Sequence, residues 1–161
     1  CLTLKQAVFL INKARRNKCN LYISDIEIYK QKKISRNKFF NIIRKKLVID
    51  NNKEILNRLT YHDIYLLKNF LEPINKLKIT KKKKKFSLEI LMKKKNMQFF
   101  FSYDIKSNIK KHTINNTNFQ KFRGNPLNKM IIKVLNNKVN FYKNQNTALF
   151  CIKLIKKLKK K

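Results

Sequence analysis

The sequence holds few side chains that could perform acid–base or metal chemistry. It has eight acidic residues, and only Asp25 and Glu27 lie close enough in the chain to share a metal ion. A metal-dependent nuclease site usually gathers more oxygen ligands than these two supply. Pairing with nearby lysines is therefore the simpler interpretation of both carboxylates. His62 and His112 are isolated, without a paired carboxylate or a cysteine motif.

Phosphate cradles and thiol sites are also missing from the sequence. A single glycine cannot build a Gly-rich phosphate loop. Cys1, Cys19 and Cys151 are far apart and form no C-x-x-C pair. We therefore expect no enzymatic activity, no cofactor, no bound metal and no small-molecule substrate.

The chemistry that the sequence does offer is positive charge. Lys and Arg number 41 against 8 Asp and Glu in 161 residues, for a formal charge of +33. Runs of lysine are most often solvated surface. The preference for Lys, Asn, Ile and Phe also indicates A/T-rich codons, which account for part of the lysine content. The scarcity of acids is the stronger signal, and it indicates a polyanionic partner. The lysine runs lie at 81–85, 93–95, 110–111, 156–157 and 159–161.

The apolar content requires a folded core beside this charge. Hydrophobic residues make up 43% and aromatics 11% of the chain, too much for a disordered basic tail. The length fits one domain of ordinary size with extensions. No apolar run approaches the length needed to cross a bilayer.

The spacing of apolar residues predicts the elements that position these lysines. We expect residues 1–52 to be a mainly helical extension, with a helix over 34–47 and a turn at 50–52. Residues 53–143 predict a core of strand, helix, two or three strands, helix and strand. Its expected elements are a strand at 54–59, a helix from Asp63 to near Pro73, strands at 78–80, 86–90 and 99–109, a loop at 115–125, a helix at 126–136 and a strand at 138–142. Residues 144–161 predict a basic amphipathic C-terminal helix over 148–161.

Two details of this core concern the charged and aromatic residues. The five-lysine run should lie at the tip of a hairpin, because it falls between two expected strands. Phe101, Tyr103 and Ile105 should point to one side of their strand, and Ser102, Asp104 and Lys106 to the other. The Phe99–Phe101 run is expected to be core.

The predicted order is that of a split βαβ fold, and specific residues resemble a known family. Arg58-Leu59-Thr60-Tyr61-His62-Asp63, followed by Leu66 and Leu67, is similar to the first strand and helix start of small-subunit ribosomal protein ten. Phe86-Ser87-Leu88 resembles that family's Phe-Thr-Val strand. Tyr103 to Lys110 resembles its Tyr-Glu-Ile-Arg-Thr-His-Leu-Arg strand, with Asn108 in place of His. The family's Gly-Pro-Ile-Pro-Leu-Pro segment is absent here.

The resemblance implies a function and a set of contacts. It implies an α+β, ferredoxin-like core with an extended Lys-rich hairpin, in a structural protein of the small ribosomal subunit head. Its partners would be small-subunit ribosomal RNA and neighbouring head proteins, in a mitochondrial ribosome or, as an alternative, a plastid-type organelle. The residues expected to contact RNA are Arg58, Lys81, Lys82, Lys83, Lys84, Lys85, Lys93, Lys94, Lys95, Lys106, Asn108, Lys110, Lys111 and Arg123.

Three alternatives remain open from the sequence. The chain could be a different organelle-encoded ribosomal protein, or a fragment of an RNA-processing enzyme, which would need clustered catalytic carboxylates. It could also be a basic protein of the membrane surface, a hypothesis supported only by the amphipathic 148–161 segment. We expect no membrane partner.

Overall fold

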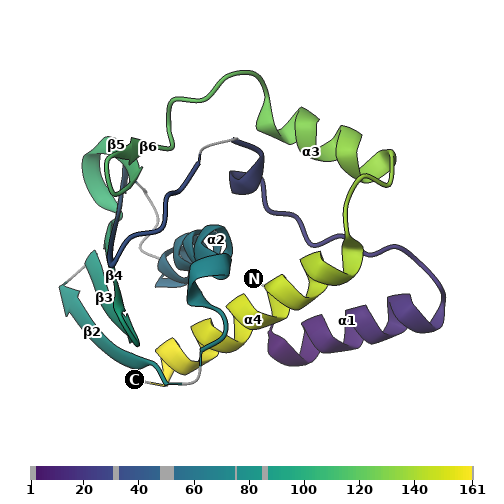
Figure 1. Cartoon of the computed structure of the whole chain (residues 1–161), viewed down its shortest axis with the longest axis horizontal. Helices are drawn as coiled ribbons and strands as arrows, with labels where there is room; N and C mark the ends of the chain where they lie inside the picture. Colours follow the sequence, from purple (N-terminus) through teal and green to yellow (C-terminus); the bar gives the residue numbers. More distant parts are fainter. Residues whose placement is uncertain (1–2, 31–32, 48–52, 75, 85–86, 161) are drawn as a thin grey trace.

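The computed structural model describes residues 3–30, 33–47, 53–74, 76–84 and 87–160. It shows an α+β protein with four helices and a six-stranded mixed sheet (Figure 1). The helices are α1 (Leu4–Arg16), α2 (Lys53–Leu71), α3 (Pro126–Leu135) and α4 (Phe141–Lys159), with a short 3-10 helix, η1 (Glu27–Lys30). The strands are β1 (Phe39–Leu47), β2 (Lys78–Lys84), β3 (Ser87–Lys94), β4 (Met97–Asp104), β5 (Lys106–Ile114) and β6 (Thr117–Asn118).

The sheet has the strand order β2-β3-β4-β1-β5-β6. Strand β1 lies between β4, to which it is parallel, and β5, to which it is antiparallel, and the remaining neighbours are antiparallel. Figure 1 shows all four helices on the same side of the sheet. The opposite side carries no described helix.

The core forms where α2 lies against the helical side of the sheet. Phe40 of β1 is fully buried and stacks on Phe99 of β4 with ring centroids 4.9 Å apart, and it also contacts Phe70 of α2. Helix α4 joins this core through three buried side chains, Cys151, Leu154 and Leu158. These three positions of the 148–161 segment are used inside the protein.

Several predicted elements are confirmed. Strands β2 and β3 form an antiparallel hairpin, α2 ends at Leu71 just before Pro73, and α3 begins at Pro126. The side chain of Asn125 accepts hydrogen bonds from the backbone N–H groups of Leu127 and Asn128, as expected of an N-cap. Phe99, Phe101, Tyr103 and Ile105 are all buried. The predicted turn at 50–52 lies outside the described residues.

The helix predicted over 34–47 is wrong, because residues 39–47 form the strand β1. Phe39, Ile42 and Ile43 have helical spacing, but the same stretch also alternates, with Phe40 and Ile42 fully buried and Phe39 exposed. The slot between β4 and β5 selects the alternating pattern, since a strand there pairs its backbone on both sides. One strand of the sheet therefore comes from the segment predicted to be a separate extension.

The strands predicted at 54–59 and 138–142 are also wrong. Helix α2 begins at Lys53, so Asp63 lies inside the helix and does not cap it. Its buried residues Leu56, Thr60, Ile64, Leu67 and Leu71 follow the helical period over five turns, which a six-residue window cannot reveal. Helix α4 begins at Phe141, where the Asn140 side chain accepts a hydrogen bond from the Lys143 backbone N–H at 2.8 Å.

Two packing expectations need correction. The described part of the five-lysine run, Lys81–Lys84, lies in the edge strand β2 and not at a hairpin tip, while Lys85 lies outside the described residues. Helix α3 adds no residue to the described core cluster. It packs instead against η1, where Lys133 lies over the Tyr29 ring at 5.7 Å from its centroid.

Adjacent phenylalanines of β1 offer a direct test of the strand. Phe40→Ala should lower the free energy of unfolding by about 3–5 kcal/mol, because it empties a buried site between Phe70 and Phe99. Phe39→Ala should cost less than about 1 kcal/mol, because this side chain is 47% exposed. Urea unfolding measures both. A helix over 34–47 would reverse the order, since Phe39 and not Phe40 lies on its apolar side.

Candidate nucleic-acid interface

The side of the sheet opposite the helices presents a mixed aromatic and basic surface, here named the open face. Strand side chains alternate between the two sides, so the neighbours of each buried residue point to this face. Its residues are Phe39, Asn41, Ile43 and Lys45 of β1, Lys78, Thr80 and Lys82 of β2, Ser87, Glu89, Leu91 and Lys93 of β3, Gln98, Phe100, Ser102 and Asp104 of β4, and Lys111 and Thr113 of β5.

The strand register brings lysines of the open face directly opposite one another. Lys78 of β2 pairs with Lys93 of β3 at one end of the face, and Lys45 of β1 pairs with Lys111 of β5 at the other. Like charges directly opposite on neighbouring strands destabilise a sheet. A bound polyanion would relieve the repulsion within both pairs, because its negative groups would lie against the lysines.

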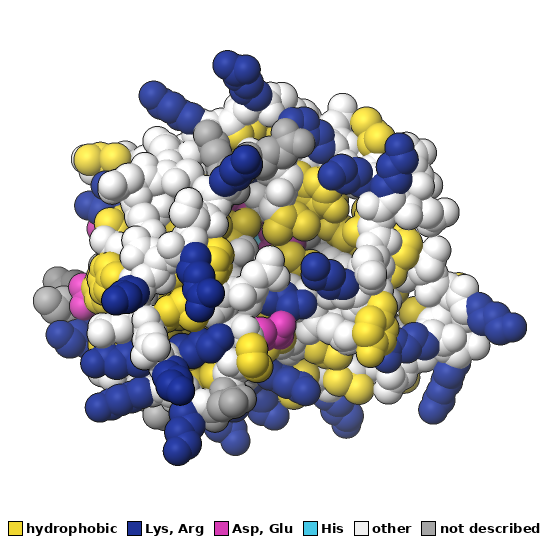
Figure 2. All heavy atoms as spheres, in the orientation of Figure 1, with side chains coloured by type: hydrophobic (Ala, Val, Ile, Leu, Met, Phe, Trp, Pro, Cys, Tyr) yellow, Lys and Arg dark blue, Asp and Glu magenta, His cyan; other side chains and the backbone are white. Residues whose placement is uncertain are grey.

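Few acids on the surface counter this charge. Asp25, Glu27 and Asp63, three of the eight acidic residues, are buried in the core. Figure 2 shows Lys and Arg side chains crowded around the lower left of the molecule, over β2, β3 and the end of α4 in Figure 1. Acidic side chains appear in that view only as small isolated spots. On the open face itself the acids are Glu89, opposite Lys82, and Asp104, opposite Lys45.

The structure divides the residues predicted to contact RNA among several surfaces. Lys82, Lys93 and Lys111 are exposed on the open face, and Lys84 is described by its backbone only. Lys95 lies in the turn between β3 and β4. Lys106, Asn108 and Lys110 are exposed along β5, at the end of the sheet that also carries Lys111. Arg58 is exposed on α2, on the helical side, Arg123 lies in the loop before α3, and Lys83 lies in β2.

Two of the predicted lysines are directed to helix ends. Lys81 Nζ donates to the Leu158 carbonyl oxygen of α4 at 3.5 Å, and Lys94 Nζ donates to the Phe70 carbonyl oxygen of α2 at 3.3 Å. Both share the side of their strand with core residues. A cation at a helix C-terminus pairs with carbonyls that have no partner within the helix. In this structure Lys81 and Lys94 hold helices to the sheet.

Sequence reasoning missed Phe39, Lys45, Lys78 and Phe100 as surface groups of one face. The prediction of a helix over 34–47 excluded Lys45 and Phe39 from the expected sheet. Phe100 was grouped with its neighbours as core, although it is half-buried and points away from Phe99 and Phe101. The alternation rule could have separated Phe100, but no local signal shows that 39–47 lies beside 97–104.

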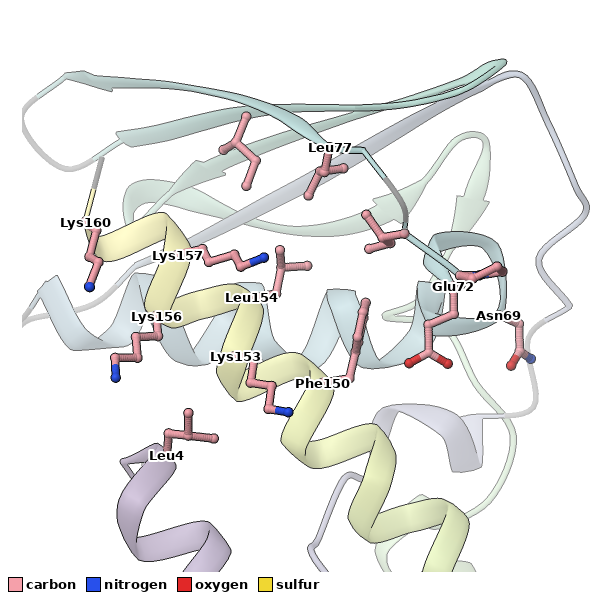
Figure 3. A pocket seen from close by; sticks show the side chains of 13 residues that line it. Leu4, Asn69, Glu72, Leu77, Phe150, Lys153, Leu154, Lys156, Lys157 and Lys160 are labelled. Atoms are coloured by element: carbon pink, nitrogen blue, oxygen red, sulfur yellow. The ribbon is translucent and has the colours of Figure 1, made fainter.

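A groove of about 1100 Å³ runs between α4 and the segment from the end of α2 to β2 (Figure 3). Its floor is apolar, and its carboxylate, Glu72, pairs with Lys68 at 3.7 Å. Three α4 lysines and the C-cap lysine that follows them line it: Lys153, Lys156, Lys157 and Lys160. Among the described residues of the lining there is no His, Cys or Ser, so they offer neither a nucleophile with a base nor a metal site.

The buried polar cluster centres on Asp63 of α2. Arg44, Tyr103 and His112 are direct neighbours across β1, β4 and β5 on the helical side of the sheet. The Asp63 carboxylate, which is fully buried, accepts hydrogen bonds from all three. The distances are 2.9 Å from Arg44 Nε and from Nη2, 2.9 Å from Tyr103 Oη, and 2.9 Å between His112 Nε2 and Asp63 Oδ1.

Two further carboxylates from the segment around η1 complete the cluster. Glu27 lies 2.9 Å from Lys30 Nζ and 3.5 Å from both Arg44 Nη2 and His112 Nδ1. Asp25 accepts a hydrogen bond from the Glu27 backbone N–H and lies 3.1 Å from His62 Nδ1. Asp25 and Glu27 therefore do not converge on a shared ligand. Within the residues that the structure describes, no three His, Cys, Asp or Glu side chains form a metal site.

The electrostatics of this cluster are those of a buried ion-pair network. Burial alone would raise the pKa of Asp63, but the charge of Arg44 and the contact with His112 outweigh it and hold that pKa well below its usual range. Burial likewise opposes ionisation of Glu27, and Arg44 and Lys30 lower its pKa nonetheless. Burial and the nearby Asp63 carboxylate raise the pKa of Tyr103. The cluster is enclosed and its groups bond to one another, so it acts as a structural link between α2 and the sheet.

Removing the central charge should destabilise the fold. Asp63→Asn leaves buried Arg44 with only the more distant Glu27 carboxylate as counter-charge, and breaking a buried ion pair costs up to about 3–5 kcal/mol. Asp104→Asn is the matched control, because Asp104 lies at the surface end of β4 and accepts one backbone hydrogen bond from Lys106. It should cost less than about 1 kcal/mol. Urea unfolding near neutral pH compares the two, and equal costs would contradict a structural role of Asp63.

Acid should weaken the same network. A carboxyl group whose pKa is lowered in the folded state contributes stability above its unfolded pKa, about 3.9 for Asp, and loses it as the pH falls. Asp63 and Glu27 both have this sign, whereas Asp25, whose pKa is raised by burial, has the opposite sign. Unfolding free energy should therefore fall from about pH 5 to about pH 2, and fall less in Asp63→Asn. An equal fall in the variant would show that other carboxylates cause the acid sensitivity.

Comparisons with known proteins do not add to this description. No family model matches the chain, and no curated protein sequence matches it. In the described part of the chain, no helix combines the length and apolar character that crossing a bilayer requires.

Proposed function

We propose that the chain is a structural protein of an organellar, mitochondrial ribosome, and that it binds small-subunit ribosomal RNA through the open face and the lysines around it. The observation that carries this proposal is the pairing of Lys78 with Lys93 and of Lys45 with Lys111 on a face that no described helix covers. Sheet formation alone gives no reason to place like charges opposite each other. Phosphate groups supply the missing counter-charge.

The scarcity of surface acids supports the same proposal. The acids that the chain keeps in its core pair with Arg44, Lys30 and the two histidines, and so leave the surface charge unbalanced. A free protein of this charge would repel itself, and a ribonucleoprotein would not. Neutralisation of phosphates by lysine is largely independent of sequence and positions the protein on RNA.

The resemblance to small-subunit ribosomal protein ten is a narrower form of this proposal. The described parts of two of its segments, Ser87-Leu88 and Tyr103 to Lys110, lie in strands β3, β4 and β5. Arg58 to Asp63 lies within helix α2, where the family would have a strand followed by a helix. A position in the head of the small subunit, beside other head proteins, belongs to this narrower form. The ribosomal proposal does not require this resemblance, because the chain would then be a different organelle-encoded ribosomal protein.

Charge reversal tests the RNA interface. Lys78→Glu, Lys82→Glu and Lys93→Glu together should weaken binding to a ribosomal RNA fragment and reduce the slope of log K against log salt by about 2, since each lost phosphate contact lowers it by about 0.7–0.9. The matched control reverses three exposed charges elsewhere, Lys5, Arg16 and Lys138, with the same change in net charge. Equal effects of the two triple variants would contradict a defined interface.

Sedimentation tests the ribosomal assignment. The tagged chain, expressed in its source cells, should co-migrate with the small ribosomal subunit in a sucrose gradient of organelle lysate. Crosslinks to ribosomal RNA should map to β2, β3 and β5. Recovery only in the free-protein fractions or with the large subunit would refute the proposal.

A further inference from the structure

We propose that the open face binds unpaired RNA bases by stacking them on Phe39 and Phe100, while lysines on either side hold the adjoining phosphates. This inference rests on the proposed RNA-binding function and adds the form of RNA recognised. Lysine contacts to phosphate do not distinguish paired from unpaired RNA, whereas aromatic stacking requires bases that are free of a helix.

The register places the two rings on neighbouring strands. Phe39 of β1 is opposite Gln98 of β4, and Phe100 of β4 is opposite Asn41 of β1. The phenylalanines are therefore diagonal neighbours, about 8 Å apart at their Cα atoms, given a strand spacing of about 4.8 Å and a rise of about 3.3 Å per residue. This separation lets each ring carry a base of its own, and successive bases stack in this way on aromatic side chains of single-strand binding proteins.

Neither phenylalanine belongs to the core. Phe39 is 47% exposed, while its chain neighbour Phe40 is fully buried. Phe100 is half-buried and lies opposite Leu91 and Asn41, on the side away from Phe99 and Phe101. With Ile43 and Leu91, the two rings give the open face an apolar centre that no described helix covers.

Polar groups suited to base edges lie beside the rings. Gln98 is exposed next to Phe39, and Ser102 follows Phe100 on the same side of β4. Amide and hydroxyl groups pair with the Watson–Crick edges of unstacked bases.

The lysines complete the surface for a nucleic-acid strand. Lys78 and Lys93 lie in the same row across the sheet as Phe39 and Gln98, at one end of the apolar centre, and Lys45 and Lys111 lie at the other end. The open face carries five lysines and two acids, so the electrostatic field over the two rings favours a polyanion. Duplex RNA buries its bases and would reach only the lysines.

The test compares conservative variants of the two rings. Phe39→Leu and Phe100→Leu keep an apolar side chain but remove the aromatic face, and Phe9→Leu on α1, which is 62% exposed, is the matched control. The probes are a short labelled single-stranded RNA of mixed sequence and a duplex of the same sequence. Affinity is measured over a salt series, and thermal unfolding confirms that each variant is folded.

Each open-face variant should raise the Kd for the single strand about five- to a hundredfold, the range that corresponds to one lost stacked base. Duplex affinity and the salt slope should stay unchanged, and Phe9→Leu should bind like the wild type. Unchanged single-strand affinity in both open-face variants would overturn the stacking proposal, as would equal losses for both probes.

The same salt series separates this failure from failure of the proposed function. If the phenylalanine variants bind normally while the Lys78, Lys82 and Lys93 reversal still loses affinity, RNA binding stands and stacking is wrong. If that reversal behaves like its control triple variant, the open face does not bind RNA, and both proposals fail. A protein partner on this face would give the latter result.

Discussion

One buried carboxylate organises this protein. Asp63 extends from α2 to the sheet and accepts hydrogen bonds from side chains on three adjacent strands, Arg44, Tyr103 and His112. Each of these groups would be costly to bury alone, since a buried polar group without a partner loses its hydration and gains nothing in return. Together they form a linkage that determines which residue of α2 lies over which row of the sheet. The apolar packing around it, by contrast, could tolerate small shifts.

This linkage explains why the aromatic and basic groups outside the core are positioned as they are. The row of Tyr103, Arg44 and His112 sets the register of β4, β1 and β5 on the helical side. A one-residue slip would turn these groups outward and bring the open-face residues into the core. The placement of Phe39 beside Phe100 therefore follows from a bond network on the opposite side of the same sheet.

The distribution of the rare acids has a second consequence. Asp25, Glu27 and Asp63 are used in the core, where each faces a basic or imidazole partner. The surface is left with lysines, some of which, like Lys81 and Lys94, hold helix ends. Others, like Lys78 and Lys93, are opposed in pairs. Charge is thus compensated inside the protein and left unbalanced at its surface, which is the physical basis of the proposed role in a ribosome.

By itself, the sequence determined the excess of positive charge and the helices and strands that have strong local signals. The alternating residues of β3 and β4, the capped start of α3 at Asn125 and Pro126, and the end of α2 before Pro73 could all be predicted, because alternation, caps and proline act within a few residues. The excess of lysine over acid also indicated a polyanionic partner without a structure. The tertiary structure alone decided that residues 39–47 form a strand, because their apolar residues fit both periods and only the slot between β4 and β5 selects one. It also decided that Asp63, Arg44 and His112 meet and that Phe39 lies beside Phe100, because pairing between distant segments leaves no trace in local spacing.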